Sequence, residues 1–529
     1  MRIPHPHRKG AYALIAVPIL AAAPFVAAGG GRSDHARPAL AEVAPSPTSA
    51  THGTGPPARA AVVRAPRHHA GIVVLRASVR GARARIVAIT FLLDGRPLGS
   101  DTTAPYALDL DETEMPRGTH ALSVEAVDRL GRRITSPRVA VAGGRRGRPA
   151  VTAEPGHGFG RALAALRRGR VTVRLGPGRY ALGGMRLGSD TRLIGAGAAT
   201  VFTPAPGASP EALLATAGRH VRVSDLAVDG LGRVVQGVEV TDGAQDVRLT
   251  RLRVRGVREN GVRASGAHAD VSVQDSVIDG RGAANAGVFD LGSDSSRDVS
   301  VVRTRISGPR GYGVVFAQRF YGLPATALHN LALDNRIADI IDPTRQDGTD
   351  EGGIWTGGVG AAIIANYVRH TGIDGIETVG SSTRTTIVAN DIAGTPVGIY
   401  LEHSTNASLI ARNLITGVGT GVNVEWRHAG GGSSANSFVA NRIVGARDAG
   451  MFVDVGSDSN RIEDNVFVDG ARPAIVLQGA SNNLVRANRA CGKAGRMVGQ
   501  QAGRWEDGSR ATSRRNRVVG NVQVHACGP

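Results

Sequence analysis

One short sequence pattern recurs from about Val221 to the C-terminus and limits the fold more than any other feature of this chain. Each copy has an apolar strand, an Asn or Asp near a turn that contains Gly, and then Gly followed by a second apolar strand, as in 363–377 and 387–400. The polar position recurs every 23 to 32 residues, which is too short for a βαβ unit and suits one coil of a β-solenoid. Such coils must stack, because one coil cannot bury its apolar strands alone. The recurring polar position is assigned to Asp225, Arg251, Asp275, Arg303, Asn335, Asn366, Asn390, Asn413, Asn441, Asn465, Asn488 and Asn516.

Two further motifs precede the repeats. An amphipathic stretch at 159–166 (FGRALAAL) is followed by a strand and the turn Pro177-Gly178-Arg179-Tyr180. Together with the repeats, these motifs resemble the right-handed parallel β-helix proteins of the pectate-lyase-like superfamily, over roughly residues 150–529. The resemblance implies an all-β, single-stranded β-helix of about 12 coils whose open end is capped by a short helix. The superfamily includes lyases, hydrolases, epimerases, esterases and non-catalytic adhesins, so the fold alone names no reaction.

The first 28 residues have the pattern of a secretory signal peptide. Arg2, Arg8 and Lys9 precede an apolar run that ends in small residues at Ala28. A retained membrane anchor is the alternative interpretation, but the prolines within the run make it a poor membrane helix. Residues 29–69 are rich in Ala, Pro, Thr and Gly and are predicted to form a flexible linker. We therefore predict a secreted bacterial protein with no membrane attachment after signal cleavage.

Residues 70–142 predict a small β-sandwich. Short alternating apolar strands are separated by turn residues such as Asp94-Gly95, at the spacing of a sandwich. The stretch from Asp94 to Asp128 resembles the cysteine-free Ig-like modules of secreted bacterial enzymes. The resemblance implies a spacer, and a weak contact with carbohydrate or cell wall is the alternative.

The charge of the chain points to an acidic partner. The formal net charge is +19, only two of the basic residues are Lys, and arginines crowd 145–174 and 248–258. Only one aromatic residue, Phe159, lies among these arginines, so we predict no nucleic-acid binding by base stacking. Guanidinium groups bind carboxylates through two parallel hydrogen bonds, and the predicted partner is therefore a polysaccharide, acidic if this basic surface binds it. A basic face that is merely solvated is the alternative.

The chain has two cysteines, Cys491 and Cys527, both near its C-terminal end. An even pair in an exported chain predicts a disulfide, and neither residue has the spacing of a zinc motif. The open end of a solenoid needs a cap, which this bond would help to form.

Carboxylates gather on the outer face of the central coils. Side chains alternate between the two faces of a strand, and this alternation points Glu377, Glu402, Glu425 and Asp454 outward as candidate catalytic residues. The last three are one coil apart and would stack about 4.8 Å from one another. Like charges at this spacing repel unless one is protonated, a cation bridges them or water screens them. That cost predicts an active or binding site, and a solvated polar face is the alternative.

The neighbours of these carboxylates favour sugar-polymer chemistry. His403 and His428 are further catalytic candidates. The predicted substrate-binding residues are Trp355, Tyr400, Trp426 and Arg427, the first two as flat platforms for sugar rings. We predict an enzyme that cleaves or epimerises a polysaccharide, either as a glycoside hydrolase with a carboxylate pair or as a lyase or epimerase acting on uronic acids. A non-catalytic solenoid that binds cell wall or glycan is the alternative.

One acidic loop is a candidate metal site. Asp347, Asp350 and Glu351 lie in the loop that leads to Trp355, and their carboxylates predict calcium, the one cofactor that the sequence indicates. A plain Gly-Asp turn is the alternative. The protein is predicted to be a monomer.

Overall fold

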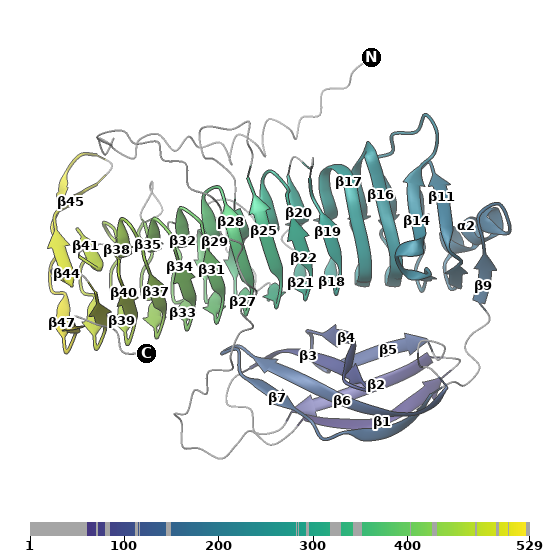
Figure 1. The fold of residues 1–529 in the computed structure, drawn as a ribbon, viewed down its shortest axis with the longest axis horizontal. Coiled ribbons are helices and arrows are strands. Elements are labelled where there is room, and N and C mark those ends of the chain that lie inside the picture. Colours follow the sequence, from purple (N-terminus) through teal and green to yellow (C-terminus); the bar gives the residue numbers. More distant parts are fainter. Residues whose placement is uncertain are drawn as a thin grey trace, which may run out of the picture.

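The protein folds as a parallel β-solenoid of about 13 turns that carries an N-terminal Ig-like module (Figure 1). The computed structural model describes residues 61–69, 72–79, 85–111, 115, 117–143, 150–281, 283, 285–292, 296–317, 329–341, 352–402, 404–425, 431–470, 473–492, 497–505 and 507–524. The predicted signal peptide at 1–28 lies outside these residues. Among the described residues, no helix combines the length and the apolar character needed to cross a bilayer.

Three parallel sheets run along the solenoid, and each coil contributes one strand to each sheet. Sheet I consists of β9 (Ala150–Ala153), β10 (Thr172–Leu175), β13 (Arg192–Ile194), β18 (Ala269–Gln274), β21 (Arg297–Val302), β24 (Leu331–Leu333), β27 (Ala362–Ile364), β30 (Thr386–Val388), β33 (Leu409–Ala411), β36 (Ser437–Val439), β39 (Arg461–Glu463), β42 (Leu484–Arg486) and β47 (Arg517–Val519). Sheet II consists of β11 (Gly178–Leu182), β14 (Thr200–Pro204), β19 (Val277–Asp279), β22 (Arg305–Ser307), β25 (Arg336–Ile340), β28 (Tyr367–Thr371), β31 (Asp391–Ala393), β34 (Leu414–Thr416), β37 (Arg442–Val444), β40 (Val466–Val468), β43 (Arg489–Cys491) and β48 (Val522–Val524). Sheet III consists of β12 (Met185–Leu187), β15 (Ala212–Thr216), β20 (Ala286–Gly292), β23 (Tyr312–Ala317), β26 (Gly352–Val359), β29 (Asp374–Thr383), β32 (Val397–Leu401), β35 (Thr420–Val424), β38 (Ala449–Val453), β41 (Ile475–Gln478) and β44 (Val498–Gln501). The long strands β16 (Arg219–Val240) and β17 (Gln245–Gly266) pass through all three sheets, and β45 (Gly503–Arg504) pairs with β46 (Arg510–Ala511) outside them.

The recurring glycine of the repeat has a packing reason. A Cβ on Gly375 would lie 2.4 Å from the Cγ2 atom of Ile392, and a Cβ on Gly398 would lie 2.5 Å from that of Ile415. The strands of sheet III therefore begin against an isoleucine of the next coil, with no room for a side chain. These isoleucines belong to an interior column that is fully buried, which is how stacking hides the apolar strands.

Two ladders of stacked polar side chains hold the corners of the coils. In the first, the side-chain oxygen of each asparagine accepts the backbone N–H of the asparagine one coil before it, as Asn413 does for Asn390 at 2.9 Å. This ladder consists of Asn335, Asn366, Asn390, Asn413, Asn441, Asn465, Asn488 and Asn521. A second ladder at another corner consists of Ser408, Asn436, Asn460, Asn483 and Asn516. In both ladders, the side-chain amides form their hydrogen bonds with backbone groups and side chains of adjacent coils.

The predicted repeat alignment is wrong at its two ends. Asn516 belongs to the second ladder, because it bonds Asn483 and not Asn488. In the first coils, Asp225, Arg251, Asp275 and Arg303 occupy the left-handed turn position one residue before the ladder. Their four side chains form two ion pairs between adjacent coils, Arg251 with Asp225 and Arg303 with Asp275. The alignment failed there because the ladder position itself is apolar or a small hydroxyl in those coils.

Helix α2 (Phe159–Arg168) closes the N-terminal end, as predicted, with Ala162 and Leu166 buried against the first coils. The Tyr180 hydroxyl donates to the carbonyls of Ala153 and Gly176 and fixes the first turn, and the short 3-10 helix η2 (Gly197–Ala199) follows β13. At the other end Cys491 is buried and disulfide-bonded. Its predicted partner Cys527 lies outside the described residues, so this pairing stays a prediction.

The Ig-like module has two facing sheets. One contains β1 (Ala61–His69), β2 (Ile72–Val79) and β5 (Ala107–Asp111), and the other contains β4 (Arg96–Asp101), β3 (Ile86–Leu93), β6 (Gly118–Asp128), β7 (Arg133–Thr135) and β8 (Val139–Gly143). Strand β1 lies within the range predicted as linker. It was missed because its sequence has no apolar period, and only its antiparallel pairing with β2 defines it as a strand.

The module docks along the outer face of sheet I, which we call the docked face (Figure 1). Ala88 and Val127 of the module pack with an apolar patch of the solenoid, which consists of Val302, Leu331, Leu333, Ala362 and Ile364. Ser100 exchanges two hydrogen bonds with the side chain of Gln274 at 2.7 and 2.8 Å. Arg129 donates to the carbonyls of Gly360 and Arg384. The module is therefore packed along several coils, unlike the spacer that the resemblance implied.

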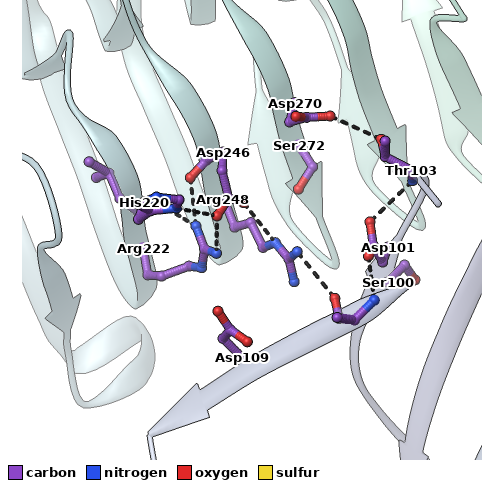
Figure 2. Close-up of polar contacts among 12 residues, drawn as sticks. Ser100, Asp101, Thr103, Asp109, His220, Arg222, Asp246, Arg248, Asp270 and Ser272 are labelled. Atoms are coloured by element: carbon purple, nitrogen blue, oxygen red, sulfur yellow. Dashed lines mark hydrogen bonds and ion pairs between the residues drawn. The ribbon is translucent and has the colours of Figure 1, made fainter. Parts of the chain in front are cut away.

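A polar cluster extends this contact toward the first coils (Figure 2). Asp246 lies 2.6 Å from a terminal nitrogen of Arg222 and 3.5 Å from Nε of Arg248. Arg248 in turn donates to the carbonyl of Ala107 on the module, and Asp101 accepts the backbone N–H of Ala107. Burial alone would raise the pKa of Asp246, but the charges of Arg222 and Arg248 outweigh it and hold that pKa at about 2. Asp246 therefore stays ionised at neutral pH.

Candidate active site

The outer face of sheet III carries the predicted carboxylates, and we call it the acidic face. Its strands pair in parallel so that Trp355, Glu377, Tyr400, Asn423 and Phe452 form one column. A second column lies two residues further along each strand, where the backbone N–H groups of Glu402, Glu425 and Asp454 bond the preceding coil. The predicted stacking of these last three carboxylates, one coil apart, is confirmed by that register.

Glu425 is the centre of this arrangement. The Tyr400 hydroxyl donates a short hydrogen bond to Oε2 of Glu425 from the preceding coil. Next to Tyr400 in the first column, Oδ1 of Asn423 is buried and has no hydrogen-bond partner among the residues that the structure describes. Glu402, Glu425 and Asp454 are all partly exposed. The face thus presents three partly exposed carboxylates, of which the middle one accepts the hydrogen bond of Tyr400.

The carboxylate column ends in two glutamines. Nε2 of Gln478 donates to Asp454 at 3.1 Å, and Nε2 of Gln501 donates to Oε1 of Gln478 at 2.6 Å. Amides stack without repulsion, so the like-charge cost is confined to Glu402, Glu425 and Asp454. Sequence reasoning gave Gln478 no role, although its place one coil after Asp454 was the available signal.

The N-terminal side of the acidic face is apolar and aromatic. Trp355 packs against Tyr312, with ring centroids 6.3 Å apart, in a cluster that also contains Phe289, Val315 and Val379. Trp355 and Tyr400 are only 7% and 9% exposed. Neither ring presents the open platform that the sequence analysis expected, and their role in substrate binding stays a prediction.

Several predicted site residues lie outside the described residues. They are His403, His428, Trp426, Arg427, Asp347, Asp350, Glu351 and Cys527. In the part of the chain that the structure describes, no group of three or more His, Cys, Asp or Glu side chains is arranged to hold a metal ion. The calcium prediction therefore stays a prediction.

Several of the arginines that crowd the first coils form ion pairs or contact the Ig-like module. Arg251 and Arg255 pair with Asp225 and Asp229 of the preceding coil, and Arg248 is held in the polar cluster beneath the Ig-like module. Upstream on the acidic face, Arg263 lies 3.9 Å from Glu239. Sequence crowding alone did not reveal this pairing, because the partners are a whole coil apart in the chain.

Two family models match parts of the chain. A bacterial Ig domain model matches residues 57–124, and a model described as periplasmic copper-binding protein (NosD) matches residues 333–524, which include the four candidate carboxylates of the acidic face. A search of curated proteins found no match.

Solved structures with a similar fold include three enzymes. The exopolygalacturonase of Yersinia enterocolitica is 10% identical, with 87% of this chain and 100% of that chain covered and a TM-score of 0.45. The A-module of the mannuronan C-5 epimerase AlgE6 of Azotobacter vinelandii is 14% identical, with 69% and 93% covered and a TM-score of 0.42. The catalytic unit of an α-1,3-glucanase of Streptomyces thermodiastaticus is 14% identical, with 88% of each chain covered and a TM-score of 0.33. These likenesses concern the fold alone.

The geometry allows acid–base chemistry on a long substrate. Strands of adjacent coils are about 4.8 Å apart, which is close to the separation of about 5 Å between the carboxyl groups of retaining glycosidases. Glu402 and Asp454 are two coils apart, or roughly 9.6 Å, near the upper end of the inverting range. Both pairs lie on the outer face of one sheet, and their side chains are partly exposed.

Proposed function

We propose that this chain is a secreted carbohydrate-active enzyme that cleaves or epimerises a polysaccharide on the acidic face. The observation that carries the proposal is the column of Glu402, Glu425 and Asp454, with the Tyr400 hydroxyl bonded to its middle member. Stacked carboxylates are unfavourable for folding, whereas a general acid and a general base must lie this close together to act on one bond.

Within this proposal, Glu402 and Glu425 form the reacting pair. The hydrogen bond from Tyr400 fixes the orientation of the Glu425 carboxylate, which acts as base or nucleophile. Glu402, one coil before it, supplies the proton to the leaving oxygen.

The reaction class is decided by a product assay. The full-length protein is incubated with a panel of neutral and uronic polysaccharides, with and without calcium, and new reducing ends, unsaturated products and changed sugar stereochemistry are measured. Glu402→Gln and Glu425→Gln should each lower turnover at least about hundredfold. The same change at Glu463, a carboxylate of sheet I paired with Arg461 and Arg486, is the control and should leave turnover intact. Wild-type rates in both acidic-face variants would remove the carboxylate column from the mechanism.

A non-catalytic glycan-binding solenoid is the second candidate, and it is supported by the match of residues 333–524 to a family model described as a binding protein and not as an enzyme. The same panel separates the two. Binding to a polysaccharide without any product in the wild-type protein, retained in Glu402→Gln, would establish the second candidate instead.

A further inference from the structure

The outer face of sheet II carries a second column of charged side chains, of the opposite sign. Five arginines occupy one register position along nine successive coil steps, and we call this column the arginine face. It consists of Arg253, Arg305, Arg336, Arg442 and Arg489, separated by Val277, Tyr367, Asp391, Leu414 and Val466. At about 4.8 Å per step the column is roughly 43 Å long.

These five arginines are exposed, and within the described part of the chain none has an ion pair with a carboxylate. Arginines at neighbouring positions behave differently. Arg255 lies 2.8 Å from Asp229, and Arg369, stacked on the ring of Tyr367, lies 2.8 Å from Asp391. The one acidic residue of the column is therefore already neutralised, and the unpaired positive charges lie in line.

Apolar side chains lie between the guanidinium groups. Val277, Tyr367 and Leu414 are among the large hydrophobic residues that the solenoid leaves exposed, with Tyr367 43% accessible. A surface that places cationic and apolar groups in one line suits a polymer with carboxylates on one edge and C–H faces beside them. A small ligand cannot span several of these arginines, and the column offers one aromatic ring, Tyr367, where a nucleic-acid single strand would use a row of stacking platforms.

We propose that the arginine face binds an acidic polysaccharide along its length, separately from the acidic face. The charge of the ligand must be negative because the column carries five unpaired cations, and its form must be extended because the cations follow one line. The proposal does not rest on the proposed function, because sheets II and III face in different directions around the coil. It assigns the basic character of the chain to one defined surface.

The test measures binding of sodium polygalacturonate to the full-length protein by titration calorimetry at two salt concentrations. The variant Arg305→Gln/Arg336→Gln/Arg442→Gln should bind about tenfold or more weakly and show a smaller salt dependence. The control Arg96→Gln/Arg117→Gln/Arg161→Gln removes the same charge from exposed arginines elsewhere and should bind like the wild type. Neutral dextran and the disaccharide of galacturonic acid should bind weakly or not at all.

Each other outcome would overturn the inference. Equal losses in the two triple variants would show a general charge effect, and tight binding of the disaccharide would show a small pocket instead of an extended surface. Duplex DNA bound as tightly as polygalacturonate, or no binding of polygalacturonate by the wild type, would rule out the ligand class. Glu402→Gln should keep full affinity, so failure of catalysis and failure of this surface are measured separately.

Discussion

The docked face and the acidic face are built by the same repeat, yet they use charge in opposite ways. On the docked face, Asp246 lies between Arg222 and Arg248, and Asp334 lies against Arg133 of the Ig-like module. On the acidic face, Glu402, Glu425 and Asp454 stack on one another. In a solenoid, residues at the same position of successive coils form a column whatever their type. The role of a charged column depends on whether another part of the protein covers that face. Covered charges must be paired, whereas open ones are available to a ligand.

The largest effect should come from breaking a pair on the docked face. Arg222→Ala leaves Asp246 partly buried with only Arg248 and His220 beside it, and should lower the free energy of unfolding by about 2 to 3 kcal/mol. Urea unfolding at pH 7 measures the loss, and hydrogen exchange should rise in β5 and the first part of β17. Arg253→Ala, on the arginine face in the adjacent coil, is the control and should stay within about 0.5 kcal/mol. Equal losses of stability in the two variants would mean that charges on the docked face stabilise the fold no more than exposed charges do.

A smaller effect is expected from the acidic face, and on turnover instead of stability. Tyr400→Phe removes the hydrogen bond to Glu425 while keeping the ring in place, and should lower kcat about tenfold with little change in the unfolding midpoint. Tyr367→Phe, on the exposed arginine face, is the matched control. A large loss of stability in Tyr400→Phe with unchanged kcat would make this contact part of the framework, as on the docked face.

The smallest effect concerns pH. Burial, and then the nearby Asp270, raise the pKa of Asp298 on the docked face to about 6. Above pH 6 the ionised Asp298 carboxylate therefore lowers the free energy of unfolding. This free energy rises as the pH falls from about 6 toward 3.8, because Asp298 takes up its proton at a higher pH in the folded state than in the unfolded state.

Asp298→Asn should consequently stabilise the protein by about 1 kcal/mol at pH 8, after allowance for solvent screening, and should make no difference near pH 4. Thermal unfolding of both proteins between pH 4 and 8 measures this. Asp464→Asn, at an exposed turn, is the control. A stabilisation that is the same at every pH would show that charge burial is not its cause.

Hydrogen bonds and packing between side chains of different coils were the features that the local sequence did not predict. The spacing from Glu402 to Glu425 and on to Asp454 was enough to predict their stacking, because parallel coils keep one register. The hydrogen bond from Tyr400 to Glu425 was not predicted, since it depends on rotamers across two coils. The near burial of Trp355 was missed for the same reason, because Tyr312 and Phe289 pack beside it from other coils.

The sequence by itself determined the solenoid, its N-terminal cap, the Ig-like module and the column of carboxylates. These follow from short-range periodicity, and the recurring Gly and Asn positions repeat because each coil must fit the next. Only the tertiary structure decided which faces are covered. The module packs on sheet I through residues such as Ala88, Ser100 and Arg129, which have no sequence period in common with the coils they contact. That docking leaves Arg222 and Arg248 as partly buried structural charges and Arg305 and Arg336 exposed, because burial depends on the neighbouring module and not on the repeat.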